Sequence, residues 1–190
     1  MSIFNSLALA AGLALTATTA LTSAAVADQL ADIKAAGKLV CGVLGTLEPF
    51  SFQDPATRAT VGYDVDLCRA VATDLGVTLE VKPIAVEARI PELTQGRVDI
   101  VSAALGYTAD RAKQIDYSNT SYVSLQKILV KADSGISQLD DLATKKISAP
   151  KGSTSEKYLR AVLPKANVLT FQDPPAAFLA LQQSKVAGMI

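Results

Sequence analysis

The chain has 190 residues, with 18 basic and 18 acidic side chains and a formal net charge of zero. This balance argues against nucleic acid or an anionic membrane as the main partner. Histidine is absent, which excludes a Ser-His-Asp triad and imidazole metal sites, and the two cysteines cannot form a four-thiolate zinc site. We therefore expect neither a metal nor a cofactor.

The N-terminal segment differs from the rest of the chain, because residues 1–27 contain no charged side chain. Leu7–Leu21 is an apolar run interrupted by threonines, and Ala25-Val26-Ala27 matches an A-x-A cleavage site before Asp28. These features predict a secretory signal peptide, although its only positive charge is the terminal amine. The run is too short for a membrane span. We expect a soluble periplasmic protein.

The first part of the mature chain alternates strands and helices. The expected elements are the helix Gln29–Ala36, strand Lys38–Leu44, loop Gly45–Val61, helix Asp64–Leu75, strand Thr78–Ile84, short helix Ile90–Gln95, strand Val98–Leu105 and helix Ala109–Gln114. Gly37 and Gly76 mark helix ends, since glycine readily takes the left-handed position there. Asp64 is expected at a helix cap and Asp66 as a charge in the first turn.

Ser121–Lys131 breaks the alternation, because it is a long extended segment with no helix before it. We predict a strand that crosses between two lobes. The pattern then resumes with a short helix Ser137–Ala143, strand Lys146–Ala149, helix Thr154–Val162, strand Asn167–Phe171, helix Pro174–Gln183 and strand Val186–Ile190. Such alternation predicts an α/β fold with mainly parallel sheets and with ligands at the carboxyl ends of the strands.

A short internal similarity supports two lobes of related layout. Leu93–Val98 reads LTQGRV and Leu181–Val186 reads LQQSKV, and each is expected to end a helix and begin a strand. Chance similarity over so few residues is the alternative. The sequence stops at Ile190 within an apolar strand, so we expect it to be truncated at the C-terminus.

The two cysteines allow two interpretations. Cys41 lies in an apolar strand and Cys68 on the apolar stripe of the next helix. A disulfide is chemically permissible in an exported protein. Two buried free thiols, packed as small hydrophobic side chains, are the alternative. The sequence does not give the distance between the two Cα atoms, so both interpretations stay open.

The segment Thr108-Ala109-Asp110-Arg111 carries the strongest local signal for a ligand. It follows an apolar strand and is predicted to open a helix, where the dipole favours acids such as Asp110 but not Arg111. Backbone N–H groups, a hydroxyl and a guanidinium at a strand's carboxyl end can together hold a carboxylate. The alternative is a surface arginine paired with Asp110 or a helix acid.

A second candidate lies in the other expected lobe. Ser153 and Glu156 form an S-x-x-E pattern that predicts a capping box. Free N–H groups and hydroxyls beside such a helix start favour an anion. The alternative is that Ser153 and Thr154 serve the helix start alone.

Several short motifs follow one another in a fixed order along the mature chain. They are Gly37-Lys38-Leu39-Val40, Pro49-Phe50, Gly62–Leu67, Arg89–Leu93, Gly96–Ile100, Thr108–Arg111, Asp116–Ser118 with Tyr122, Leu139–Leu142 and Lys151–Glu156. Each motif is weak alone, but their order and spacing resemble the family 3 extracellular solute-binding proteins, the polar amino-acid receptors of ABC importers.

The resemblance implies a type II periplasmic-binding-protein fold, with two α/β lobes that close on a ligand. Residues 28–122 would form lobe I, 123–131 a hinge strand and 132–190 lobe II. Both lobes would be incomplete, because the chain of the family returns to lobe I in a segment that is missing here. The implied function is capture of an amino acid by a monomer that delivers it to a membrane ABC permease, without catalysis.

The resemblance also assigns candidate ligand-binding residues. Arg111 matches the arginine that holds the α-carboxylate of the ligand. Ala104 and Gly106 match a loop that binds the α-amino group or the carboxylate, where only their backbone groups could serve. Ser153 and Thr154 match the loop of the second lobe that also meets the carboxylate.

The chain departs from the family where aromatic rings often clamp the ligand, because Leu47 and Val86 stand at two such positions. Phe50 remains, either as a ligand contact or as a core residue. The acid that pairs with the ligand ammonium in the family lies beyond this sequence.

Arg89 matches a position where some receptors for acidic amino acids hold a side-chain carboxylate. It therefore slightly favours an acidic ligand. The alternative is a surface salt bridge with Glu87 or Glu92.

Two other functions fit the same scaffold. Cyclohexadienyl dehydratases resemble these receptors but need a carboxylic acid over the substrate, for which Glu48 is the one candidate here. The second alternative is the sensor domain of a receptor.

Overall fold

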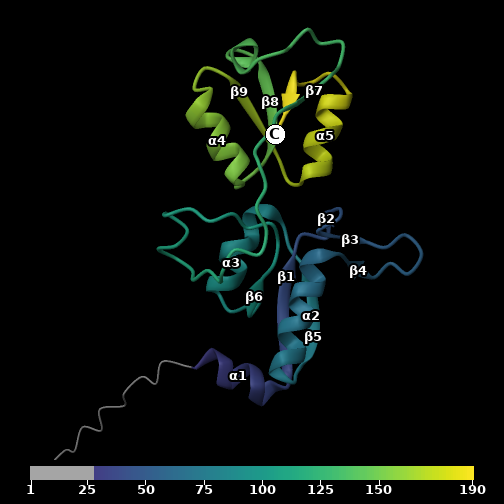
Figure 1. The fold of residues 1–190 in the computed structure, drawn as a ribbon, viewed down its shortest axis with the longest axis vertical. Coiled ribbons are helices and arrows are strands. Elements are labelled where there is room, and N and C mark those ends of the chain that lie inside the picture. The colour runs from purple at the N-terminus through teal and green to yellow at the C-terminus, as the bar shows by residue number, and fades with distance from the viewer. Residues whose placement is uncertain (1–27) are drawn as a thin grey trace, which may run out of the picture.

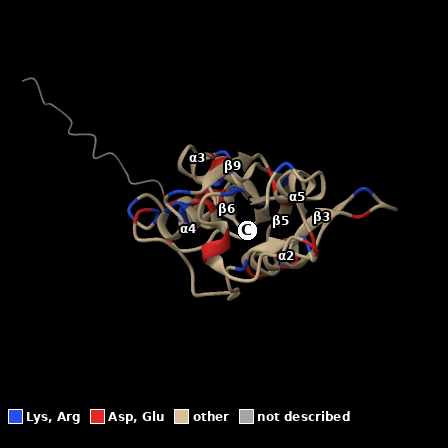
Figure 2. Cartoon of the chain, turned by 90° about the horizontal axis from the view of Figure 1, so that it is seen from above, with Lys and Arg blue, Asp and Glu red and all other residues tan. Residues whose placement is uncertain are grey.

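The computed structural model describes residues 28–190, so the predicted signal peptide lies outside the described residues. Figure 1 shows two bodies, one with the purple-to-teal elements and one with the green-to-yellow elements, joined by a thin crossing segment. Basic and acidic positions are interspersed over the described chain (Figure 2). Within residues 28–190 no helix is long and apolar enough to cross a membrane.

The first body is built on a parallel sheet with the order β5-β1-β6. The central strand β1 (Lys38–Val43) pairs with β5 (Thr78–Pro83) on one side and with β6 (Ile100–Val101) on the other. Two helices, α1 (Gln29–Ala36) and α2 (Tyr63–Leu75), precede β1 and β5 and end at left-handed glycines as predicted. The sheet is therefore of the predicted parallel kind, although β6 is much shorter than expected.

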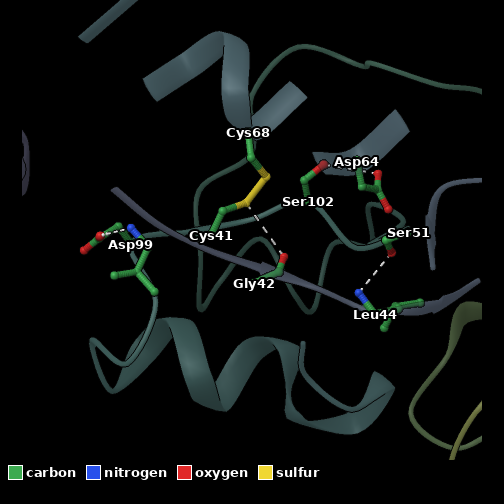
Figure 3. The surroundings of a disulfide bond; sticks show 9 residues. Cys41, Gly42, Leu44, Ser51, Asp64, Cys68, Asp99 and Ser102 are labelled. Atoms are coloured by element: carbon green, nitrogen blue, oxygen red, sulfur yellow. Dashed lines mark hydrogen bonds between the residues drawn. A yellow bond between two sulfur atoms is a disulfide. The ribbon is translucent and has the colours of Figure 1, made fainter. Parts of the chain in front are cut away.

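The core of this body includes a disulfide between Cys41 and Cys68, whose Cα atoms are 6.2 Å apart (Figure 3). Both cysteines are fully buried, and they pack with Val43 and Val65. The bond ties β1 to α2. Of the two interpretations left open by the sequence, the disulfide is the one that the structure adopts.

The expected loop Gly45–Val61 contains a small antiparallel sheet with the order β2-β3-β4. Its strands are β2 (Thr46–Leu47), β3 (Ser51–Gln53) and β4 (Thr60–Val61). Strands of two or three residues are too short to show alternation, and the prolines that suggested a loop lie in the connections between them.

The predicted cap at Asp64 is wrong. Gly62 is the N-cap of α2 and makes no side-chain capping bond. Asp64 is buried, and its Oδ1 accepts a hydrogen bond of 3.1 Å from Ser102 Oγ. Asp66 is exposed in the first turn, as predicted, and lies 3.9 Å from Arg69. The two acids therefore face opposite environments although they are two positions apart.

The chain between β5 and β7 is less regular than predicted. After β5 come the 3-10 turn η1 (Val86–Ala88) and the short helix α3 (Arg89–Thr94). The predicted helix Ala109–Gln114 is wrong, because these residues form turns. The predicted strand Ser121–Lys131 shrinks to β7 (Leu129–Val130). Alternation alone does not make a strand, since a strand needs a hydrogen-bonded neighbour.

The second body contains a sheet with the order β7-β10-β8-β9. Its elements after β7 are η2 (Leu139–Leu142), β8 (Lys146–Pro150), α4 (Thr154–Val162), β9 (Asn167–Phe171), α5 (Pro174–Gln182) and β10 (Gly188–Met189). Strand β8 runs parallel to β9 and β10, while β7 is antiparallel to β10. The core packs around Leu142, Ile147 and Leu159, which are almost fully buried.

The internal similarity has a structural counterpart, because α3 and α5 end in the same way. The second residue after each helix has a left-handed backbone, with φ of 66° at Gly96 and 56° at Ser184. The matching pairs of N–H to carbonyl bonds are Gly96 to Leu93 and Arg97 to Glu92 in one body, and Ser184 to Leu181 and Lys185 to Ala180 in the other. The two bodies therefore share a helix-to-strand connection.

Candidate functional site

The candidate site lies where two loops of the two bodies meet. The β6 loop, residues 102–111, follows the carboxyl end of β6, and the β8 loop, residues 151–153, follows the carboxyl end of β8. The Gly152 carbonyl accepts a hydrogen bond of 2.8 Å from Arg111 Nη2 and one of 3.4 Å from Arg89 Nη2. Two arginines from the first body thus converge on one backbone oxygen of the second.

Arg111 is buried, with 6% of its surface exposed. Its Nη1 donates to the Gly106 carbonyl over 2.7 Å, and its backbone N–H donates to Thr108 Oγ1 over 3.2 Å. Asp110 instead contacts the ammonium groups of Lys113 and Lys157. The alternative of a surface arginine paired with Asp110 is therefore wrong. Within residues 28–190, the guanidinium bonds of Arg111 to Gly106 and Gly152 leave further N–H groups for a ligand.

Arg89 is also buried, at 3% exposure. Its Nε donates to the Val86 carbonyl over 2.7 Å, and its Nη1 donates to the carbonyls of Ala103 and Ala104 over 3.0 Å each. With the bond to Gly152, four of its five N–H groups reach backbone oxygens.

The alternative of a surface salt bridge for Arg89 is wrong. Glu87 pairs with Lys151 at 2.7 Å, while Glu92 pairs with Lys82 at 3.0 Å and with Arg97 at 2.7 Å. Both neighbouring carboxylates therefore bind other cations.

The site holds two buried positive charges, the guanidinium groups of Arg89 and Arg111. Burial and the nearby Arg111 charge lower the pKa of Arg89 to about 10. In the described part of the chain neither Arg89 nor Arg111 forms an ion pair with a carboxylate. Two buried guanidinium groups without an acid favour the arrival of an anion, because opposite charge offsets their mutual repulsion.

The turn of the β6 loop faces the start of α4. Ala104 is exposed and has a left-handed φ of 48°. The Gly106 carbonyl accepts bonds from Arg111 and from Tyr117 Oη. A Cβ on Gly106 would lie 3.2 Å from Thr154 Cγ2, so the two predicted ligand positions are in close contact across the two bodies.

Ser153 is the N-cap of α4, and its Oγ accepts a hydrogen bond of 3.0 Å from the Glu156 N–H. The predicted reciprocal bond is displaced by one residue, because Glu156 Oε2 accepts from the Gly152 N–H over 2.8 Å. Glu156 therefore holds Gly152, which has a left-handed φ of 71°, in front of the helix. The predicted cap is confirmed, and the predicted box is wrong in its second half.

Phe50 lies among aromatic rings. Its ring centroid is 5.0 Å from that of Tyr122 and 6.1 Å from that of Tyr63, and Tyr63 Oη donates to the Ser121 carbonyl over 2.7 Å. These contacts tie β2–β4 to the crossing segment. They do not bring the ring to the two arginines.

The two aliphatic replacements share one environment. Val86 is buried in a cluster with Leu44 and Ala103, and Leu47 packs against this cluster. The two positions at which the resemblance implied aromatic rings therefore share one apolar cluster, which includes Ala103.

An open groove of about 340 Å³ lies elsewhere between the two bodies. It is lined by residues of β2, of the crossing segment, of α5 and of β10, and Glu48 is exposed at its edge. Neither arginine lines it. Among residues 28–190 no group of three or more acidic or cysteine side chains is placed to hold a metal ion.

Sequence reasoning missed two residues that shape the site. Gly152 was part of a motif but had no assigned role, and its carbonyl is the common acceptor of both arginines. Asp64 was taken as a cap but supports the β6 loop through Ser102. Neither role leaves a local pattern, since both depend on contacts between distant parts of the chain.

Comparisons with known proteins identify the family of this chain. Residues 39–185 match the bacterial extracellular solute-binding proteins, family 3. The chain is 34% identical over 159 residues to the glutamine-binding protein of Geobacillus stearothermophilus, covering 82% of this chain and 61% of that protein.

Two solved structures of reconstructed ancestors are also similar. One is the amino-acid-binding protein AncCDT-1, a precursor of cyclohexadienyl dehydratase, with a TM-score of 0.80, 34% identity, and coverage of 84% of this chain and 72% of that one. The other is an ancestral arginine-binding protein bound to arginine, with a TM-score of 0.75, 37% identity, and coverage of 80% and 69%.

The chain spans about three fifths of the length of the curated glutamine-binding relative, at 61%. The matched region includes both loops of the candidate site and the strands β6 and β8 that they follow. The chain therefore belongs to the bacterial extracellular solute-binding proteins of family 3.

Proposed function

We propose that this protein captures an amino acid in the periplasm and presents it to a membrane ABC permease, without catalysing a reaction. The observation that carries the proposal is Arg111, a buried guanidinium between two α/β bodies with N–H groups left for an anion and no carboxylate partner in the described residues. An α-carboxylate matches such a group in charge and in geometry.

In this proposal the two loops hold one ligand from opposite sides. Arg111 donates to the α-carboxylate from the first lobe, and the hydroxyls of Ser153 and Thr154 with the free N–H groups of α4 meet it from the second. Backbone groups of Ala104 and Gly106 serve the α-amino group. Ligand contacts to both lobes stabilise the closed arrangement, because the open one makes only half of them.

The lobe boundaries of this mechanism are residues 28–122, 123–131 and 132–190. Of residues 123–131, only β7 joins the second sheet. Just before this segment, Tyr122 packs on Phe50 and the Ser121 carbonyl accepts from Tyr63. We propose that the working unit is a monomer and that Phe50 has a packing role near the hinge.

The identity of the amino acid is the finer part of the proposal. Two of the similar proteins named above are a glutamine-binding and an arginine-binding protein. An acidic ligand was predicted from Arg89, but most N–H groups of that side chain reach backbone carbonyls. A neutral or acidic amino acid held by its α-carboxylate is what the two loops favour.

The test is a thermal-shift panel of the twenty L-amino acids on the signal-free chain, beside Arg111→Ala. A ligand at about 100 times its Kd adds roughly 2.7 kcal/mol of stability to the folded protein. We expect a rise in melting temperature with at least one amino acid and no rise in the variant. The absence of any shift in a cooperatively melting wild type would contradict the proposal.

The enzyme alternative is tested with the same preparation. Since AncCDT-1 is a precursor of cyclohexadienyl dehydratase, we would incubate the protein with prephenate and with arogenate. Turnover that is lost in Glu48→Gln would replace the receptor proposal. Glu48 is exposed at an open groove, so we expect none.

A further inference from the structure

The turn at Ala104 needs support from outside itself. Ala104 has a left-handed backbone, with φ of 48°, which a residue with a Cβ adopts only when its surroundings impose it. It is exposed at the tip of the β6 loop, so its own side chain contributes little packing. The support therefore has to come from groups below the turn.

One support is Asp64, which reaches the turn from the first turn of α2. Only 5% of its surface is exposed, and its Oδ1 accepts from Ser102 Oγ over 3.1 Å (Figure 3). Its Oδ2 is buried without a hydrogen-bond partner among residues 28–190. Burial raises the pKa of Asp64, while the hydrogen bond from Ser102 opposes the rise. The hydrogen bond from Ser102 in the β6 loop therefore offsets part of the cost of burying the Asp64 carboxylate.

The other support is Arg89, which reaches the turn from the start of α3. It donates to the carbonyls of Ala103 and Ala104, and to the Val86 carbonyl below them. Carbonyl oxygens are therefore held by a cation, and the hydroxyl of Ser102 is held by an anion. The cation thus contacts backbone carbonyls of the turn, and the anion contacts a side-chain hydroxyl at its start.

We propose that Asp64 and Arg89 are positioning residues that hold the Ala104 turn in its ligand-binding shape. This replaces the ligand-contact role expected for Arg89, because most of its donors are already engaged. The effect on affinity rests on the proposed function, whereas the effect on the turn does not.

The first experiment measures the turn without any ligand. Hydrogen–deuterium exchange of a peptide spanning residues 101–107 would be compared in the wild type, Ser102→Ala and Asp64→Asn. Ser102→Ala removes the same hydrogen bond from the half-buried side of the pair, so it keeps the fold if Asp64→Asn does not. Asp64→Asn retains an acceptor for Ser102 but removes the charge.

The matched control is Asp66→Asn, on the same turn of α2 but exposed. For Arg89 the variant is Arg89→Met, with exposed Arg69→Met as its control. We expect exchange in the turn to rise about tenfold in Ser102→Ala and Arg89→Met and to stay unchanged in both controls. Equal exchange in the variants and the controls would overturn the proposal.

The second experiment measures affinity for the amino acid that gives the largest thermal shift. The variants with the larger rise in exchange should also lose more affinity. A loosened turn spends a smaller fraction of its time in the conformation that binds the ligand. Arg89→Lys restores the charge but not the fork of donors, so it should recover only part of the affinity if Arg89 acts through carbonyls. Full recovery of affinity in Arg89→Lys would instead show that Arg89 acts on the ligand through its charge alone.

The two proposals fail separately. If no amino acid shifts the wild type but exchange rises in the variants, the receptor proposal fails and the positioning role stands. If ligands bind and exchange in the turn does not change, the positioning role fails.

Discussion

The β6 loop and the β8 loop occupy equivalent places, each after the carboxyl end of a parallel strand, but they present positive charge in different ways. The β8 loop enters helix α4 directly, with Ser153 as its cap and Glu156 holding Gly152. The β6 loop enters turns, and its positive group is the side chain of Arg111, fixed by Gly106 and Gly152.

The two loops therefore differ in how the sequence determines them: neighbouring residues determine the β8 loop, and contacts with distant residues determine the β6 loop. The groups of the β8 loop come from a helix start that five consecutive residues specify. The position of Arg111 depends on carbonyls in two bodies, and on the turn at Ala104 that Asp64 and Arg89 support. Changes in the β6 loop should therefore affect binding more than stability, and changes in the β8 loop should affect both.

The largest effect is expected from Arg111→Ala. A charge-assisted pair of hydrogen bonds to a carboxylate is lost, so affinity should fall about 100-fold, as measured by calorimetric titration. Exposed Arg69→Ala is the control and should bind as the wild type does. Unchanged affinity in Arg111→Ala would show that the ligand carboxylate does not bind Arg111.

Gly152→Ala should come next. A Cβ there would lie 3.2 Å from Glu87 Cα, and the left-handed φ of 71° disfavours it further. We expect affinity to fall about tenfold, because the β8 loop can no longer pack against η1 and the Gly152 carbonyl moves away from the two arginines. Gly135→Ala is a matched control, since its φ is 70° but nothing lies within 4 Å of the added atom. Equal loss of affinity in both variants would show that the close contact is not needed.

Ser153→Ala should give a smaller effect on two quantities. Loss of the N-cap should lower the free energy of unfolding by about 1 kcal/mol, and affinity should fall a few-fold. Asp173→Ala removes the N-cap of α5, where Oδ1 accepts from the Ala176 N–H over 2.8 Å. It should cause a similar loss of stability in urea denaturation but no loss of affinity. If both variants bind equally well, Ser153 is a cap alone.

The smallest effect concerns pH and the helix that carries Arg89. Hydrogen bonds from Arg97 and Lys82 lower the pKa of Glu92 to about 2, from an ordinary value of 4.5. Ionised Glu92 therefore stabilises the fold above about pH 5, and this contribution is lost as pH falls toward 2.

Glu92→Gln should accordingly be less stable than the wild type at pH 7 in urea denaturation, with the gap closing on acidification. A gap that is constant from pH 7 to pH 3 would contradict the ion-pair origin of the shift.

Local patterns in the sequence predicted most of the fold. Left-handed glycines ended α1 and α2, the Ser153 cap began α4, and apolar runs placed the central strands β1 and β8. Each of these features is decided by a few consecutive residues, which is why the pattern sufficed.

Features decided by distant contacts could not be predicted in the same way. Asp64 has the spacing of a first-turn acid, but burial against Ser102 turned it toward the sheet. The alternation of Ser121–Lys131 resembles a strand, yet only Leu129 and Val130 pair with a neighbour. For the site, Arg111 was recognised from its position against the expected helix dipole, although the helix itself does not form.

The most direct test of the central claim is a calorimetric cycle with one amino acid and its α-carboxamide, on the wild type and on Arg111→Ala. The carboxamide keeps the side chain and the α-amino group but lacks the carboxylate charge. We predict that the wild type binds the amino acid about 100-fold more tightly than the carboxamide and that Arg111→Ala binds the two alike. Undiminished discrimination in Arg111→Ala would show that the carboxylate is held by a different residue.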